Sequence, residues 1–124
     1  MTDIVSLNPV NVQRNTIVEY LWKKNQYRPP WLWSVIDILK KSVEKAEGFL
    51  LKCDLVGGGS RRGAHNCGSC DKQIINKIND FSLEQNPKVF NNLSCDCMEK
   101  WYDQINLENM GFGSLTDISR MKNL

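Results

Sequence analysis

The most regular hydrophobic pattern in the chain runs from residue 32 to residue 50. Apolar residues recur there at alternating spacings of four and three, which places them on one face of an α-helix of about five turns. Asp37 and Lys41 lie one turn apart on the polar side. We therefore predict a long helix whose apolar side belongs to a core. The apolar positions are Leu32, Ile36, Leu39, Val43, Ala46 and Leu50.

A shorter helix is predicted to begin at Thr16. Thr16 and Glu19 have the spacing of a capping box, in which the hydroxyl accepts from the amide three residues on and the carboxylate reaches back. An apolar stretch over residues 17–22 follows, and Lys23-Lys24-Asn25 ends it. Residues 28–30, Arg-Pro-Pro, then favour an extended turn, because proline restricts both itself and the residue before it.

Two further helices are predicted in the second half of the chain. The third runs from Cys70 to Glu84, with one apolar face, and Asn86-Pro87 ends it. The fourth begins at Ser94, a favourable N-cap residue. The apolar positions of the third helix are Ile74, Ile75, Ile78 and Phe81. Those of the fourth helix are Met98, Trp101, Tyr102 and Ile105.

These elements predict a mainly α fold, a small bundle of about four helices in one domain. Residues 1–14 contain a short apolar run with no obvious partner strand and are expected to form an N-terminal arm. The remaining segments are a helical hairpin over 15–56, a flexible glycine-rich loop over 57–66, a zinc-clipped helix pair over 67–110 and a tail over 111–124.

Composition agrees with a globular domain, since 41% of the 124 residues are hydrophobic and 24% are charged. The net charge of +2 argues against a dedicated nucleic-acid binder, which would be more basic. We see no signal peptide and no apolar stretch near the ~20 residues of a membrane span. The sequence thus predicts a soluble intracellular protein, cytoplasmic or nuclear.

The sharpest chemical signal comes from four of the five cysteines. Cys67 and Cys70 form a C-x-x-C pair with a glycine inside it, and Cys95 and Cys97 form a C-x-C pair. Each pair lies where a predicted helix begins, and helix N-termini favour the thiolate that binds metal. A tetrahedral zinc site needs four such ligands around one ion. We therefore predict a Zn²⁺ clip that joins the starts of the third and fourth helices.

Three alternatives for these residues stay open. His65, the only histidine, is a possible substitute for one member of the C-x-C pair. Cys67 and Cys70 could instead form a redox-active dithiol, with Cys67 as the attacking thiol. The cysteines could also simply pack in the core. Cys53, at the end of the predicted long helix, is interpreted as a small buried hydrophobe.

An aromatic and basic cluster surrounds Pro29 and Pro30. Trp31 and Trp33 lie about 200° apart on a helix, so they cannot both face one core. An exposed tryptophan beside cations is typical of a protein-binding hot spot or of a stacking platform for single-stranded nucleic acid. The candidate partner-binding residues are Trp31, Trp33, Lys23, Lys24 and Arg28.

The glycine-rich segment also carries Arg61 and Arg62, which are candidate anion-binding residues. The segment lacks the phosphate-binding pattern of P-loops, and it is better explained as a linker. Catalysis has little support, because no catalytic triad, paired carboxylates or nucleotide fingerprint can be placed. We therefore predict a non-enzymatic, zinc-stabilised helical module that binds a protein partner in a regulatory or adaptor role. The alternatives are a nucleic-acid-binding regulator and a thiol oxidoreductase.

Overall fold

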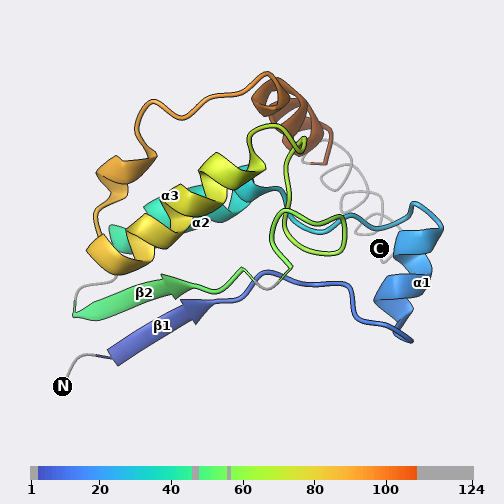
Figure 1. Cartoon of the computed structure of the whole chain (residues 1–124), viewed down its shortest axis with the longest axis horizontal. Coiled ribbons are helices and arrows are strands. Elements are labelled where there is room, and N and C mark those ends of the chain that lie inside the picture. Colours follow the sequence, from blue (N-terminus) through green and yellow to red (C-terminus); the bar gives the residue numbers. More distant parts are fainter. Residues whose placement is uncertain (1–2, 46–47, 56, 109–124) are drawn as a thin grey trace, which may run out of the picture. The chain divides into compact units, whose positions relative to one another are not determined.

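The computed structural model of the chain describes residues 3–45, 48–55 and 57–108 (Figure 1). The elements are β1 (Asp3–Leu7), α1 (Ile17–Lys23), α2 (Leu32–Val43), β2 (Phe49–Cys53), α3 (Asp71–Glu84) and the 3-10 helix η1 (Pro87–Phe90). A further helix covers residues 97–108. The predicted helical class is therefore confirmed in its main part, but a small sheet is added. The predicted tail over 111–124 lies outside the described residues.

The chain divides into two compact units, Met1–Leu93 and Ser94–Leu124. The first unit contains the sheet and the helices α1 to α3. The described part of the second unit contains the helix over 97–108.

The sheet consists of β1 and β2, which pair in parallel with Ile4 opposite Leu50. The prediction of one helix over residues 32–50 is wrong beyond Val43, where α2 ends. Gly48 follows with a φ of +81°, a conformation that L side chains rarely adopt. Leu50 then lies in β2 and is 41% exposed, so its place in the helical spacing was a coincidence.

The free edge of β2 is covered by side chains from the end of α3. Gln85 accepts a hydrogen bond from the Leu51 amide at 2.8 Å and donates one to the Leu51 carbonyl oxygen at 2.6 Å. The hydroxyl of Ser82 accepts from the Cys53 amide at 3.2 Å. Side chains thus supply the contacts that a third strand would make.

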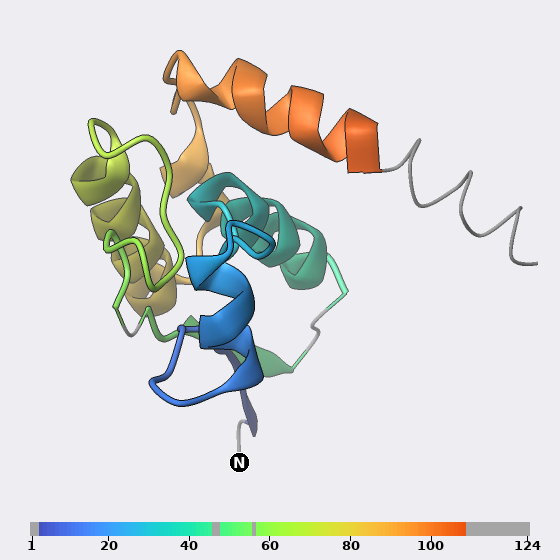
Figure 2. The ribbon, with the colours of Figure 1, turned by 90° about the vertical axis from the view of Figure 1, so that its right-hand side faces the viewer.

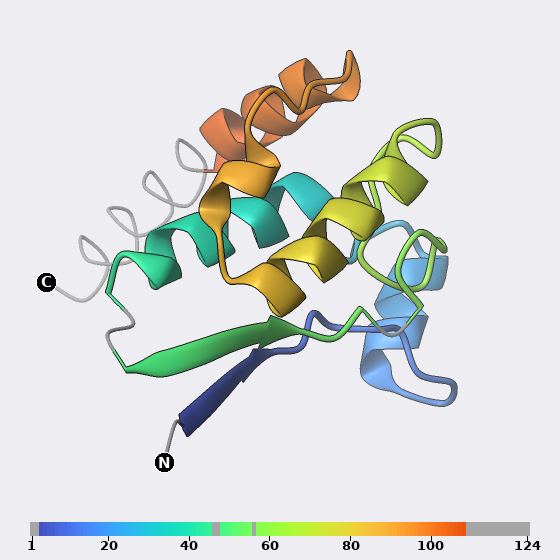
Figure 3. The same ribbon diagram turned by 60° about the vertical axis from the view of Figure 1, so that its left-hand side comes forward.

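The core of the first unit lies where α2, α3 and η1 meet. Figures 2 and 3 show α2 and α3 side by side, on the same side of the strand pair. The ring of Phe81 stacks on that of Phe90 at a centroid distance of 5.3 Å. Three of the four positions predicted for the apolar face of α3 are buried, and Ile75 is half-buried. Buried apolar residues of this core are Leu32, Val35, Ile36, Leu39, Ile74, Ile78, Phe81 and Phe90.

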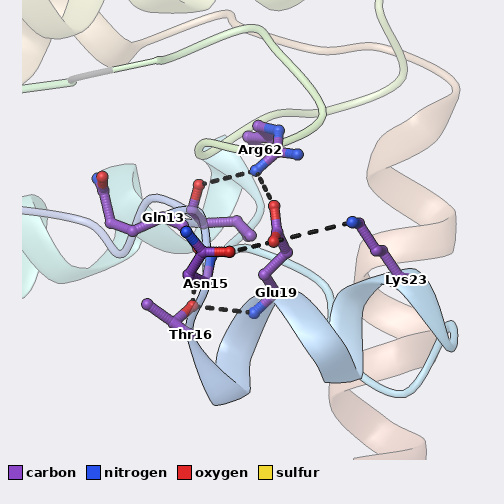
Figure 4. Close-up of polar contacts among 7 residues, drawn as sticks. Gln13, Asn15, Thr16, Glu19, Lys23 and Arg62 are labelled. Atoms are coloured by element: carbon purple, nitrogen blue, oxygen red, sulfur yellow. Dashed lines mark hydrogen bonds and ion pairs between the residues drawn. The ribbon is translucent and has the colours of Figure 1, made fainter.

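The predicted cap of α1 is present, and a polar cluster surrounds it (Figure 4). The Thr16 hydroxyl accepts from the Glu19 amide at 3.1 Å, while the Glu19 carboxylate accepts from the Asn15 amide at 3.1 Å. Arg62 pairs with the same carboxylate at 2.8 Å, and Lys23 lies 3.8 Å from it. The Asn15 amide first, and then Arg62, lower the pKa of Glu19.

Candidate metal centre

The first cysteine pair lies in a tight turn at the start of α3. Cys70 is the N-cap residue of α3 and is buried, whereas Cys67 is exposed. Their Sγ atoms lie 3.9 Å apart. Sulfurs about 2.3 Å from one tetrahedral ion would be about 3.8 Å apart, which matches this spacing. Gly68, between them, has a φ of +97°, so the turn favours the glycine found there.

Asp71 fixes the shape of this turn. Its buried carboxylate accepts from the Asn66 amide at 2.9 Å and from the Gly68 amide at 2.8 Å. Both amides belong to the stretch that carries Cys67. A carboxylate in the first turn of a helix is also favoured by the helix dipole. Asp71 therefore fixes the backbone on either side of Cys67.

Asn66 connects the turn to the rest of the unit. Its Nδ2 donates to the Sγ of Cys70 at 3.4 Å, and its Oδ1 accepts from the Leu32 amide at 2.8 Å. Asn66 is only 5% exposed. Neither Asn66 nor Asp71 was singled out from the sequence. Their position directly beside the C-x-x-C motif was the signal available, because ligating cysteines need such hydrogen-bond partners.

The second cysteine pair lies at the start of the helix over 97–108. Cys97 is the first residue of that helix and is buried, and Cys95 is half-buried. The Met98 amide donates to the Cys95 carbonyl oxygen at 2.9 Å. The helix begins three residues after Ser94, where the sequence placed its start. Of the residues predicted for its apolar face, Trp101 is buried and Tyr102 is exposed.

The Sγ atoms of Cys67, Cys70, Cys95 and Cys97 all lie within 4.8 Å of one another. Four thiol groups at this separation could hold a metal ion, and thiolate is the ligand that zinc and iron–sulfur sites prefer. His65 does not belong to this group. Its Nδ1 lies 2.8 Å from the Gly63 carbonyl oxygen.

Cys53 is separate from the group and ends β2 rather than a helix. It is 5% exposed, and burial, followed by the charge of Asp54, raises its pKa to about 12. Its thiol therefore stays protonated at neutral pH. This environment agrees with the interpretation of Cys53 as a buried hydrophobe.

The aromatic and basic residues occupy different environments. Trp33 is buried, so of the two tryptophans only the half-buried Trp31 can reach a partner. The guanidinium of Arg28 stacks on the Trp31 ring at 3.9 Å. It also donates to the carbonyl oxygens of Pro29 at 2.7 Å and His65 at 2.9 Å. Arg28 therefore links Trp31 to the cysteine turn.

The other candidate cations lie at the end of α1 or in the glycine-rich loop. Lys23 ends α1, and the Nζ of Lys24 lies 5.8 Å from the centre of the Tyr20 ring. Arg62 pairs with Glu19 and stacks on Trp22 at 4.5 Å, so its charge is compensated within the fold. Arg61 is exposed. Arg61 is thus the better placed of the two candidate anion-binding arginines.

The fold and these residues define the chain as mostly helical, with a four-cysteine group that could hold a metal ion. The chain is similar to archaeosine synthase subunit beta of Methanosarcina acetivorans, with 43% identity over 112 residues. It is also similar to archaeosine synthase subunit beta of Thermococcus kodakarensis, with 40% identity over 101 residues. An uncharacterized protein of Methanocaldococcus jannaschii shares 39% identity over 115 residues.

These matches cover 90%, 81% and 91% of the chain, respectively. They cover only 32%, 31% and 31% of the relatives, so the chain spans about a third of their length. No family model matches the chain, and no solved structure matches it. The two relatives that are named as subunits come from archaea, so they give no support to the predicted nuclear location. Their names do not support the predicted regulatory role either. Within the described residues, no helix is long and apolar enough to cross a membrane.

Proposed function

We propose that this chain is a zinc-stabilised, non-catalytic module of a protein of the archaeosine synthase subunit beta kind, and that it binds a protein partner. The single observation that carries the proposal is the 43% sequence identity, over 90% of the chain, to a relative with that name. A subunit designated beta implies at least one other subunit. The four-cysteine group supplies the structural part of the proposal.

Zinc is the ion that this donor set favours. Four thiolates suit a closed, tetrahedral structural site, whereas a catalytic zinc keeps one position open for water or substrate. With all four cysteines bound, such an ion would have no position for a substrate. It would join the turn of Cys67 and Cys70 to the start of the helix over 97–108. Its binding free energy would then contribute directly to folding.

Elemental analysis of protein purified without chelator tests the metal. We expect close to one equivalent of zinc per chain, confirmed by native mass spectrometry. Iron with inorganic sulfide in its place would identify an iron–sulfur cluster and would contradict the zinc assignment. A metal content near zero in reduced, folded protein would contradict the metal centre as a whole.

The partner surface that we propose is centred on Trp31 and Arg28. Trp31 is half-buried, and Arg28 holds it from one side, so its ring is already ordered before binding. Large aromatic and arginine side chains dominate protein interfaces. The side chains of Lys23 and Lys24 are exposed and would lie at the rim, where charges mostly change the association rate.

Capture of the other archaeosine synthase subunit by the tagged chain tests this surface. We expect Trp31→Ala to weaken capture by about thirty-fold, corresponding to about 2 kcal/mol. Tyr20→Ala is the matched control, because Tyr20 is an aromatic residue that is 61% exposed on α1. Equal capture by both variants would contradict the surface. RNA or DNA binding that falls steeply with salt and is lost on reversal of Lys23 and Lys24 would favour the nucleic-acid alternative instead.

A further inference from the structure

The N-cap residue of α2 does not itself supply the side-chain cap that a helix normally has. Trp31 occupies the N-cap position, and its side chain makes no capping hydrogen bond. The first amides of a helix have no partner within the helix and need one elsewhere. The Leu32 amide finds that partner in Asn66 Oδ1 at 2.8 Å, although Asn66 is 34 positions away along the chain.

The same side chain contacts the cysteine pair. While Oδ1 of Asn66 accepts from α2, its Nδ2 donates to the Sγ of Cys70 at 3.4 Å. A hydrogen bond to a ligating sulfur stabilises the thiolate and orients it toward the ion. One buried amide group thus forms a bridge between a proposed metal ligand and the first turn of α2.

The backbone on either side of this bridge is also paired. The His65 amide donates to the Pro30 carbonyl oxygen at 3.1 Å, and Arg28 donates to the His65 carbonyl oxygen at 2.9 Å. The residues directly before Cys67 are therefore bound to the segment that carries Arg28 and Trp31. All of these contacts lie within the first unit.

We infer that Asn66 is a positioning residue that couples the metal centre to the Trp31 surface. It serves both as a hydrogen-bond donor to the Cys70 sulfur and as the cap of α2. An ion that fixes Cys70 also fixes Asn66, and through Asn66 it fixes the backbone next to Trp31. This inference rests on the metal binding proposed above, but it needs no knowledge of the partner.

Two substitutions separate the two hydrogen bonds of Asn66. Asn66→Asp keeps an oxygen for the Leu32 amide and removes the donor to Cys70. Asn66→Ala removes both. Asn76→Asp is the matched control, because Asn76 is exposed on α3 and undergoes the same chemical change.

The first measurement is the affinity for zinc, by competition with a chromogenic chelator. We expect both Asn66 variants to bind zinc at least ten-fold more weakly, as is usual when a partner of a metal ligand is lost. The control should match the wild type. With cobalt in place of zinc, the sulfur-to-metal charge-transfer band of Asn66→Ala should move to lower energy, because the Cys70 sulfur has lost the hydrogen bond from Asn66.

The second measurement is the ¹⁹F NMR spectrum of protein labelled with fluorotryptophan. The chain has four tryptophans, and the Trp31 signal is identified by its loss in Trp31→Phe. Addition of zinc to the wild type should shift the Trp31 signal and leave that of Trp22 in place, whereas this zinc-dependent shift of the Trp31 signal should be lost in both Asn66→Asp and Asn66→Ala. If Asn66→Ala does not fold, the zinc affinity of Asn66→Asp decides the question.

The outcomes distinguish this inference from the function on which it rests. A wild-type protein that binds no metal contradicts the proposed metal centre. A wild type that binds zinc, together with an Asn66→Asp variant that binds it as tightly, overturns the role of Asn66. A zinc-dependent shift of the Trp31 signal that remains unchanged in Asn66→Asp overturns the coupling.

Discussion

Helix α2 and the turn over residues 65–71 belong to the same unit but are held by different forces. α2 buries five apolar or aromatic side chains, and its position depends on packing. In the turn, the buried side chains of Asn66 and Asp71 form hydrogen bonds to specific amides and to a sulfur. A packed helix can relax partly around a lost methyl group. A buried polar turn cannot, because each unpaired group keeps its full desolvation penalty.

The largest effect is expected when the turn is broken at a proposed ligand. Cys70→Ser should destabilise the zinc-loaded protein by several kcal/mol, because the ion contributes folding free energy directly. Urea denaturation gives this value. Ser69→Ala, one residue away and exposed, should be close to neutral. A difference from the wild type that persists at full size after chelation would mean that the metal is not its cause.

Breaking the packed helix should have the next largest effect. Leu39 is 1% exposed, and Leu39→Ala should cost about 2–5 kcal/mol, the usual range for a buried leucine. Unlike the effect of Cys70→Ser, this loss should be the same with and without zinc. The exposed neighbour Lys40 is the control, and Lys40→Ala should stay within about 0.5 kcal/mol. Equally mild substitutions would mean that this face of α2 does not form the core.

The contact between Gln85 and β2 sharpens the comparison, since it is a polar contact without a metal. Gln85→Ala should cost about 1–3 kcal/mol, because it leaves the amide and carbonyl of buried Leu51 without their partners. Thermal unfolding gives this value, with Gln73→Ala on the exposed side of α3 as the control. A loss of stability no larger than that of Gln73→Ala would show that water replaces the hydrogen bonds of Gln85.

The smallest effect should come from the polar cluster of α1 and should depend on pH. The pKa of Glu19 is lowered from 4.5, so its stabilising contribution is complete above pH 4.5 and is lost as pH falls through the lower, folded-state pKa. Glu19→Gln should therefore lower the unfolding midpoint at neutral pH but not in strong acid. Unfolding of both proteins at several pH values measures this. A difference that does not change with pH would contradict the role of the carboxylate.

Local patterns in the sequence were sufficient for most of the helices. The apolar spacing located the core face of α2 up to Leu39, and Thr16 with Glu19 marked the start of α1. The predicted third helix, from Cys70 to Glu84, differs from α3 only in that Cys70 is its N-cap. These features depend on residues within one or two turns of each other. Such short-range relations can be read along the chain.

Contacts between distant segments could not be predicted in the same way. β1 and β2 are each only five residues long, and neither has a neighbour in sequence with which to form a hairpin. Leu50 also continued the helical spacing by chance, which hid β2. For the candidate metal centre, the spacing of the cysteines indicated the four residues whose sulfur atoms lie within 4.8 Å of one another. The roles of Asn66 and Asp71 depend on loop geometry, which residue types alone do not determine.

The parallel pairing of β1 with β2 has a consequence for the order of events during synthesis. Phe49 follows Leu7 by 42 positions, and α1 and α2 lie between them. At about 5–20 residues per second, a ribosome takes about 2–8 seconds to make that stretch. During this time β1 has no partner strand, and α1 and α2 are synthesised before β2 is. The first strand of the chain thus cannot take its final place until β2, the fourth element of its unit, has been made.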